Sequence, residues 1–196
     1  LLVTLVFGII YLIMYPGLGG FKGMLGCSQT KQYDEEISQA GEENAPIYTR
    51  YAGQQITAIA QDHAALKIGQ RLFSTYCTAC HGSDAGGARG FPNLRDDDWL
   101  YGGEPATIKT TILNGRAGMM PAWKGVIKDN DINDASEYVM GLSGRTVENT
   151  AATRGAQTFK LYCAACHGAD GKGNHQIGAP NLTDDIWLHG GSKERI

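Results

Sequence analysis

Apolar residues follow two different patterns along this chain. The first stretch, Leu1 to Tyr15, reads LLVTLVFGIIYLIMY and contains no charged residue, so a helix formed by it has no polar face. From residue 62 onward, apolar residues recur three or four positions apart, which is the spacing of amphipathic helices. This spacing predicts helices leading up to residues 76 and 162 and further helices near 105–113 and 129–142. Because no convincing run alternates between apolar and polar residues, we predict an all-α fold.

The N-terminal apolar stretch predicts a membrane segment. It is shorter than the ~20 residues that cross a bilayer, no basic residue precedes it, and no small-residue cleavage site follows it. A signal peptide and a buried globular helix therefore both fit poorly, and we interpret residues 1–15 as the end of a transmembrane helix whose beginning is missing. Pro16 and Gly17 end this helix. Residues 16–61 then form a juxtamembrane linker, in which Ile47 to Ala60 are a candidate short helix.

The rest of the chain contains one segment twice. IGQRLFSTYCTACHGSD at 68–84 aligns with RGAQTFKLYCAACHGAD at 154–170, and PNLRDDDWLYGG at 92–103 aligns with PNLTDDIWLHGG at 180–191. We predict two tandem domains of one fold, at 62–145 and 146–196. The second domain is expected to be incomplete at its C-terminal end, because it lacks a counterpart of the helix at 129–142.

The helix that opens each copy carries a glycine and a phenylalanine four positions apart. These pairs are Gly69 with Phe73 and Gly155 with Phe159, and the spacing places each pair on one helix face. Glycine at such a position lets another helix cross closely. We expect the helix at 129–142 to cross the first copy at Gly69 and Phe73, which leaves the equivalent face of the second copy exposed.

Composition narrows the class of protein. Apolar residues make up 42% of the 196 residues and charged residues 19%, so the chain as a whole is not disordered. The formal net charge of −3 excludes the general basic surface of a nucleic-acid-binding protein. Five cysteines are too few for a disulfide scaffold. The 27 glycines indicate many tight turns, or backbone that lies against a large flat group.

Each copy contains the pattern Cys-x-x-Cys-His, which is typical of covalent haem attachment. Two thiols three positions apart on a helical turn each form a thioether with one vinyl group of a porphyrin, and the next residue places an imidazole beneath the iron. Zinc needs two more ligands than each motif supplies, and a thioredoxin-like site needs a βαβ surround that is missing. We therefore predict two covalently bound haem c groups, attached through Cys77, Cys80, Cys163 and Cys166, with axial ligands His81 and His167.

The sequence indicates the partners of the axial histidines in both copies, but it indicates a sixth iron ligand clearly only in the first copy. Pro92 and Pro180 follow the Gly-rich loops, and their carbonyls are candidate acceptors for the second ring nitrogen of each histidine. In the first copy Met120 is the favoured sixth ligand because Pro121 stiffens the loop, with Met119 as the alternative. The second copy has no equivalent methionine, and its substitutes are weak. His175 and His189 are the candidate substitutes for a ligand of the second iron. Trp99, Trp187 and Arg116 are candidates to pack on haem edges or to bind propionates.

These features together resemble a known family. IMYPGLGGFKGMLG followed by the acidic QYDEE, and then two CxxCH domains with GRAGMMPAW in the first, are similar to the dihaem c-type cytochrome subunit (subunit III, the CcoP type) of cbb3-type cytochrome c oxidase. The similarity runs over the whole chain. Cys27 lies where an aromatic residue is expected in that family. CxxCH alone is generic, whereas the tandem after YPGLG is specific.

The resemblance implies a function and a location. Family members are single-pass proteins of the bacterial inner membrane, with both haem domains in the periplasm. They take electrons from a soluble cytochrome c donor and pass them to the monohaem subunit and then to the catalytic subunit of a proton-pumping oxidase. The chain is then an electron-transfer subunit of an enzyme and does not itself reduce oxygen. The resemblance also implies His81 and His167 as proximal ligands and Met120 as the distal ligand of the first haem.

Two other functions share the haem motifs. A membrane-tethered dihaem carrier that serves a dehydrogenase differs only in its partner, and copurification with haem b and copper distinguishes the two. A dihaem peroxidase needs an open iron position, which the MMPAW loop of the first copy argues against.

Overall fold

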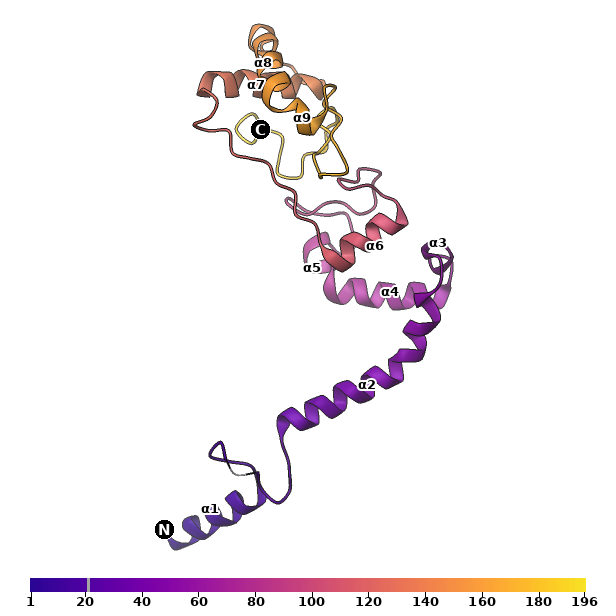
Figure 1. Cartoon of the computed structure of the whole chain (residues 1–196), viewed down its shortest axis with the longest axis vertical. Helices are drawn as coiled ribbons and strands as arrows, with labels where there is room; N and C mark the ends of the chain where they lie inside the picture. Colours follow the sequence, from indigo (N-terminus) through magenta and orange to yellow (C-terminus); the bar gives the residue numbers. More distant parts are fainter. Residues whose placement is uncertain (21) are drawn as a thin grey trace. The chain divides into compact units, whose positions relative to one another are not determined.

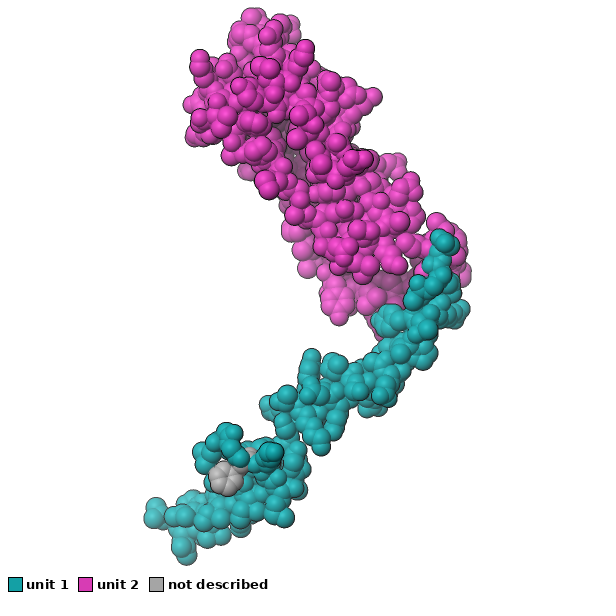
Figure 2. Space-filling model, in the orientation of Figure 1, with its two compact units in different colours: residues 1–55 teal, residues 56–196 magenta. Residues whose placement is uncertain are grey.

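A computed structural model of the chain describes residues 1–20 and 22–196. These residues form nine helices and three isolated bridges, and none of them belongs to a β-sheet strand, which confirms the all-α prediction for the described part. The described residues divide into two compact units, residues 1–55 and residues 56–196, which Figure 2 shows in separate colours.

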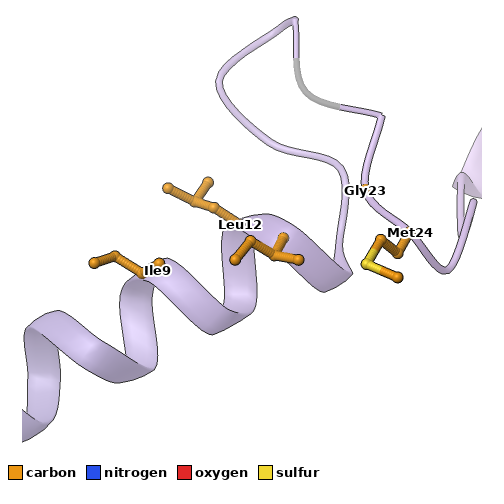
Figure 3. Close-up of a pocket in the computed structure, with 5 residues that line it drawn as sticks. Ile9, Leu12, Gly23 and Met24 are labelled. Atoms are coloured by element: carbon orange, nitrogen blue, oxygen red, sulfur yellow. The ribbon is translucent and has the colours of Figure 1, made fainter.

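The first unit begins with helix α1, Leu2–Met14. After α1 the chain turns back on its own helix end (Figure 3), and the backbone N–H groups of Met24 and Leu25 donate to the carbonyls of Ile13 and Met14 at 2.8 and 3.0 Å. Carbonyls in the last turn of a helix have no partner within the helix, so this loop satisfies two of them. None of the helices in residues 1–20 and 22–196 combines the length and apolar character needed to cross a bilayer.

A long helix, α2 (Gln29–Ala52), occupies the segment predicted as linker. Ser28 caps its N-terminus, and side-chain pairs four residues apart support it, such as Gln32 donating to Glu36 and Gln39 donating to Glu43, both at 3.0 Å. These polar pairs stabilise a helix that has no buried face. The expected helix over residues 47–60 is wrong, because α2 ends at Ala52 and a separate short helix, α3, covers Ile56–Ile59.

The second unit contains both sequence copies (Figure 1). In the first copy α4 is capped by Asp62 and in the second α8 is capped by Glu148, and each acidic side chain accepts from two backbone N–H groups of the first turn. The helices of the first copy are α4 (His63–Tyr76), α5 (Thr78–His81), α6 (Pro105–Asn114) and α7 (Asp129–Leu142). Those of the second copy are α8 (Asn149–Tyr162) and α9 (Ala164–His167).

Helices α7 and α8 form the main packed core of this unit, and they lie side by side in Figure 1. A Cβ atom at Gly155 would fall on the backbone carbonyl of Asp134, so glycine is required where the helices cross. Phe159 is only 2% exposed and packs on the Tyr138 ring, with centroids 5.2 Å apart. Arg154 clamps the crossing by donating to both carboxylate oxygens of Asp134, at 2.6 and 2.9 Å.

This packing corrects the expected partner of the helix at 129–142. We expected α7 to cross α4 at Gly69 and Phe73, but it crosses α8 at Gly155 and Phe159 instead. A Cβ atom at Gly69 would meet nothing within 4 Å. One contact particular to this arrangement is the Arg154–Asp134 ion pair, since the position equivalent to Arg154 in α4 is the uncharged Ile68.

Loops of the two copies also contact one another. The backbone N–H of Gly90 donates to the Leu188 carbonyl at 2.8 Å, and the Arg89 guanidinium donates to the His189 carbonyl at 3.2 Å. The Trp123 and Tyr162 rings meet edge to face with centroids 5.3 Å apart. The copies are therefore joined through loops and aromatic rings as well as through α7.

We expect the packing of α7 on α8 to weaken in acid. The Arg154 hydrogen bond lowers the pKa of Asp134, the Lys193 hydrogen bond lowers the pKa of Glu137, and backbone N–H groups lower the pKa of Glu148. A carboxyl whose folded pKa lies below its unfolded value stabilises the fold fully above the unfolded value, and this contribution is lost as the pH falls through the folded pKa. Denaturant unfolding followed by circular dichroism between pH 6 and 3 should show this loss, with Asp134→Asn giving a flatter profile. If Asp134→Asn leaves the pH dependence of the free energy of unfolding unchanged, the ion pair of Asp134 is not the cause of the acid effect.

Candidate haem sites

The first site is built where α4 passes into a single helical turn. Cys77 follows α4 as its C-cap residue, and α5 carries Cys80 and His81 on the next turn. Gly82, with φ of +80°, then turns the chain away immediately after the histidine. Nδ1 of His81 lies 3.0 Å from the Pro92 carbonyl oxygen. With its proton on Nδ1, the ring donates to that carbonyl and keeps the lone pair of Nε2 for a metal.

The second site repeats this geometry. Cys163 caps α8, α9 carries Cys166 and His167, and Gly168 has φ of +81°. Nδ1 of His167 lies 3.0 Å from the Pro180 carbonyl oxygen. His167 is buried, with only 6% of its surface exposed. The predicted proline acceptors are thus confirmed in both copies.

Glycines in the loops allow each proline carbonyl to reach its histidine. The N–H of Gly87 donates to the His81 carbonyl and that of Gly173 to the His167 carbonyl, both at 2.8 Å. Both glycines have positive φ, +76° and +82°, and a Cβ atom at Gly87 would meet the Phe91 carbonyl at 2.6 Å. A side chain at these positions would displace the segment that carries the proline. The predicted role of glycine in tight turns is confirmed here.

The side chains at each site fit a haem c. None of the four motif cysteines is paired in a disulfide within the described part of the chain, so all four sulfurs are available to form thioethers. Burial, with a smaller effect of Cys166, raises the pKa of the Cys163 thiol. No residue between 62 and 126 is buried by protein alone, which fits a small domain whose core includes a large flat apolar group. In the second copy, Nε1 of Trp187 is buried without a partner among the described residues, which fits a nearby acceptor such as a propionate.

The structure leaves the methionines of the first copy at the surface. Met119 is 90% exposed and Met120 is 66% exposed, both in the segment without helix between α6 and α7. Neither side chain is packed into the domain beside His81. The choice between the two sulfur ligands therefore stays a prediction.

We expect Met120→Ala to remove the sulfur–iron charge-transfer absorption of one haem and to lower its reduction potential. A thioether ligand stabilises ferrous haem, and its loss removes that effect. Met119→Ala should leave both properties nearly intact. Optical spectra and a spectroelectrochemical titration of the two variants measure this. The reverse result assigns the ligand to Met119.

The other candidate residues lie at contacts between protein groups. The Arg116 guanidinium stacks on the Tyr101 ring at 5.1 Å, and a Cβ atom at Gly102 would meet Nδ1 of His175 at 3.5 Å. Trp99 packs against the backbone of Gly103 in the same way that Trp187 packs against Gly191. One further residue at the second site carries no signal in the sequence.

That residue is Arg145. Its guanidinium stacks on the Trp187 ring at 5.1 Å and donates to the carbonyl of Gly191. It lies in the connection between α7 and α8, and no motif marks it, so only the three-dimensional structure brings it to the second site.

Two family models match the second unit. The model described as cytochrome c oxidase, cbb3-type, subunit III matches residues 64–139, and the model described as cytochrome c matches residues 152–196. The two matched segments correspond to the two sequence copies, and each contains one CxxCH motif.

Curated relatives match almost the whole chain. The cbb3-type cytochrome c oxidase subunit CcoP of Rubrivivax gelatinosus is 47% identical over 96% of this chain, which spans 62% of that relative. The CcoP subunit of Cereibacter sphaeroides is 38% identical over 99% of this chain, which spans 73% of that protein. The chain belongs to the CcoP/FixP family of cbb3-type oxidase subunits. A third relative, the FixP subunit of Azorhizobium caulinodans, is 37% identical over 98% of this chain.

Family membership confirms the resemblance found in the sequence. Two cytochrome c domains in one CcoP-type chain imply two haem c groups, as predicted from the motifs. The family also favours an oxidase subunit over a carrier for a dehydrogenase or a peroxidase. The assignment of individual cysteine, histidine and methionine ligands stays a prediction, which the His–Pro geometry supports.

Proposed function

We propose that this CcoP-type chain is the dihaem electron-transfer subunit of a proton-pumping cbb3-type cytochrome c oxidase. It accepts electrons from a soluble cytochrome c and passes them to the monohaem subunit and on to the catalytic subunit. It belongs to an oxygen-reducing enzyme without holding the oxygen-reducing site. The observation that carries this proposal is the duplicated Cys-x-x-Cys-His turn with its histidine–proline contact, in a chain similar to CcoP along nearly its whole length.

The residues of each site hold, orient and shield the redox group. Cys77 and Cys80 would hold one haem and Cys163 and Cys166 the other, each through two thioethers. Bound haem supplies reversible one-electron chemistry at its iron. The Pro92 carbonyl keeps the proton of His81 on Nδ1 and fixes the ring plane, so the ligand does not reorient when the charge at the site changes.

The second site is the better shielded of the two. His167 is buried, and α7 covers α8, the helix that leads to it, where the Tyr138 ring packs on Phe159. A less polar surround disfavours the additional positive charge of the oxidised state. This burial supports a reduction potential of the second site that depends on the packing of α7.

We further propose that the chain is anchored in the bacterial inner membrane by a single helix, with both haem domains in the periplasm. Large apolar side chains of α1 are widely exposed, such as Leu2 at 79%, Val3 at 80% and Phe7 at 66%. Exposed apolar surface of this extent is stable in lipid rather than in water. Covalent haem attachment on the translocated side supports the periplasmic placement.

Complementation tests the proposed function. A bacterial host that lacks its own CcoP subunit should recover oxygen consumption with reduced cytochrome c when it expresses this chain. The purified chain should bring haem b and copper with it. A His81→Ala and His167→Ala double variant, expressed at the same level, should restore neither electron transfer nor the absorption of two low-spin haems.

The rival functions predict different outcomes. Copurification with a dehydrogenase in place of haem b and copper supports the carrier, and rapid peroxide turnover by the isolated chain supports the peroxidase. Either result contradicts the oxidase proposal.

A further inference from the structure

The two sequence copies meet through equivalent segments. In each copy a glycine loop lies between the axial histidine and its proline, at residues 88–91 in the first copy and 174–179 in the second. Each copy also has a tryptophan segment, at residues 99–103 and 187–191. The glycine loop of each copy contacts the tryptophan segment of the other copy, so the same pair of surfaces is used twice.

One half of the interface joins the first glycine loop to the second tryptophan segment. The N–H of Gly90 donates to the Leu188 carbonyl at 2.8 Å, and the Arg89 guanidinium donates to the His189 carbonyl at 3.2 Å. A Cβ atom at Gly190 would lie 3.6 Å from the Arg89 guanidinium. Both the main chain and a side chain of the first loop therefore hold the second segment.

The other half joins the second glycine loop to the first tryptophan segment. The Tyr101 ring packs directly on the backbone of Gly178, so a Cβ atom at Gly178 would fall on the ring. A Cβ atom at Gly102 would lie 3.5 Å from Nδ1 of His175. This half is held by close packing, whereas the first half is held by hydrogen bonds.

The sequence repeat relates the two halves to one another. It aligns Arg89 with His175 and Gly102 with Gly190, so the Arg89–Gly190 contact becomes the His175–Gly102 contact when the copies are exchanged. A surface that meets its own equivalent in this way is the arrangement of a twofold axis. The axis is approximate here, because the second glycine loop is longer than the first.

The interface lies close in sequence to both axial histidines. Each glycine loop ends immediately before the proline whose carbonyl faces the axial histidine at 3.0 Å, which is Pro92 with His81 in the first copy and Pro180 with His167 in the second. A movement of either loop at the interface is therefore felt at the contact that orients an iron ligand.

Tyr101 also meets the segment that carries the methionines of the first copy. A Cβ atom at Gly118 would lie 2.8 Å from the Tyr101 hydroxyl oxygen and 3.8 Å from the Gly178 carbonyl oxygen. Gly118 immediately precedes Met119 and Met120, the candidate sulfur ligands. Tyr101 is thus the residue at which the second copy, the first tryptophan segment and the methionine segment come together.

We propose that this two-sided interface is the electron-transfer junction between the two haem sites, and that Tyr101 and Gly178 are its positioning residues. The junction rests on the proposed function, because it requires a haem at each site. One electron leaves the iron of the reduced site and reduces the iron of the oxidised site, so no bond forms or breaks and no proton has to move. The part of the protein is to hold the two sites in a fixed geometry, which removes the cost of bringing them together at each transfer.

Gly178→Ala tests the junction, and Gly90→Ala is its matched control. The two glycines are equivalent in the repeat and both have positive φ, +69° and +86°, so alanine strains the backbone at both. The added methyl group falls on the Tyr101 ring at residue 178, whereas a Cβ atom at Gly90 would meet nothing within 4 Å. Only Gly178→Ala therefore pushes the two copies apart.

Two measurements on the haem-loaded full chain follow each variant. The first is hydrogen–deuterium exchange of the peptide that contains residue 90, whose N–H is held by the Leu188 carbonyl of the other copy. The second is the rate of electron exchange between the two sites after a flash-excited ruthenium complex reduces one of them. Haem content is recorded for each variant.

We expect Gly178→Ala to speed amide exchange at residue 90 and to slow electron exchange severalfold, with the haem content of the parent chain. Gly90→Ala should leave the electron-exchange rate close to that of the parent. Tyr101→Ala should slow electron exchange, whereas Tyr101→Phe keeps the ring and should preserve the rate. If Gly178→Ala prevents folding, the comparison of the two Tyr101 variants decides alone.

Three results would overturn the proposal. Unchanged amide exchange in Gly178→Ala means that the copies do not meet at Tyr101. Faster amide exchange with an unchanged electron-exchange rate means that the interface is not the junction, and this result leaves the proposed function intact. A parent chain without two covalent haems contradicts the proposed function and the junction together.

Discussion

A chain with both Cys163→Ala and Cys166→Ala is expected to carry one covalent haem in place of two. Each haem is held by two thioethers from one motif, so removing both thiols of the second motif leaves no covalent bond at that site. We expect the remaining haem to keep the spectrum of the first site. The haem content per chain, measured as the pyridine haemochromogen, and the mass of the denatured protein check this directly.

Two matched variants control for this result. Cys77→Ala with Cys80→Ala should also leave one haem, now with the properties of the second site, and Cys27→Ala should leave both, because the exposed Cys27 belongs to neither motif. Two covalent haems in either double variant would show that the motif does not attach the group. Loss of both haems in the Cys27 variant would show that this thiol has a role we have not assigned.

Local features of the fold follow closely from the sequence. The last helix of the first copy was expected over 129–142 and α7 covers Asp129–Leu142, and Pro105 begins α6 as expected. Asp129 and Asp131 lie in the first turn of α7, and Lys128 occupies the cap position without a side-chain hydrogen bond. Propensity and spacing act over a few residues, so they indicate the helix better than its cap.

The histidine–proline contacts also follow from the sequence, although they join residues more than ten positions apart. The reason is that the Gly-rich loop between them is almost determined by its glycines. Gly87 and Gly173 have backbone conformations that other residues rarely adopt, and the chain between histidine and proline must close around them. A repeated local pattern then gives the same 3.0 Å contact twice.

The partner of α7 does not follow from the sequence, because the chain offers it two equal faces. Ala65, Gly69 and Phe73 of α4 match the buried residues of α8, which are Ala151, Gly155 and Phe159. A pattern argument cannot choose between identical patterns. One difference between the two helices is Arg154, at whose position α4 has Ile68, and the interaction of Arg154 with Asp134 depends on the three-dimensional path of the connections. The long helix α2 was missed for a related reason, since polar pairs and no apolar face support it.

The asymmetry of the two faces gives the last prediction, which compares Phe159→Ala with Phe73→Ala. Phe159 is 2% exposed and packs on Tyr138, so truncating it removes a filled part of the α7–α8 core and leaves a cavity. We expect Phe159→Ala to lower the free energy of unfolding of the haem-loaded chain by about 3–5 kcal/mol. Phe73 is half-buried on a face that no helix covers, so Phe73→Ala should cost well under that amount.

Denaturant unfolding followed by far-ultraviolet circular dichroism and by haem absorption separates the two variants. The Soret absorption of the second haem should shift in Phe159→Ala, because α8 leads directly into Cys163 and loses its packing against α7. The identity of the two sequence motifs makes each variant the control for the other. Equal losses from the two variants would mean that α7 covers both faces to the same extent in solution, and a larger loss from Phe73→Ala would place α7 mainly on α4.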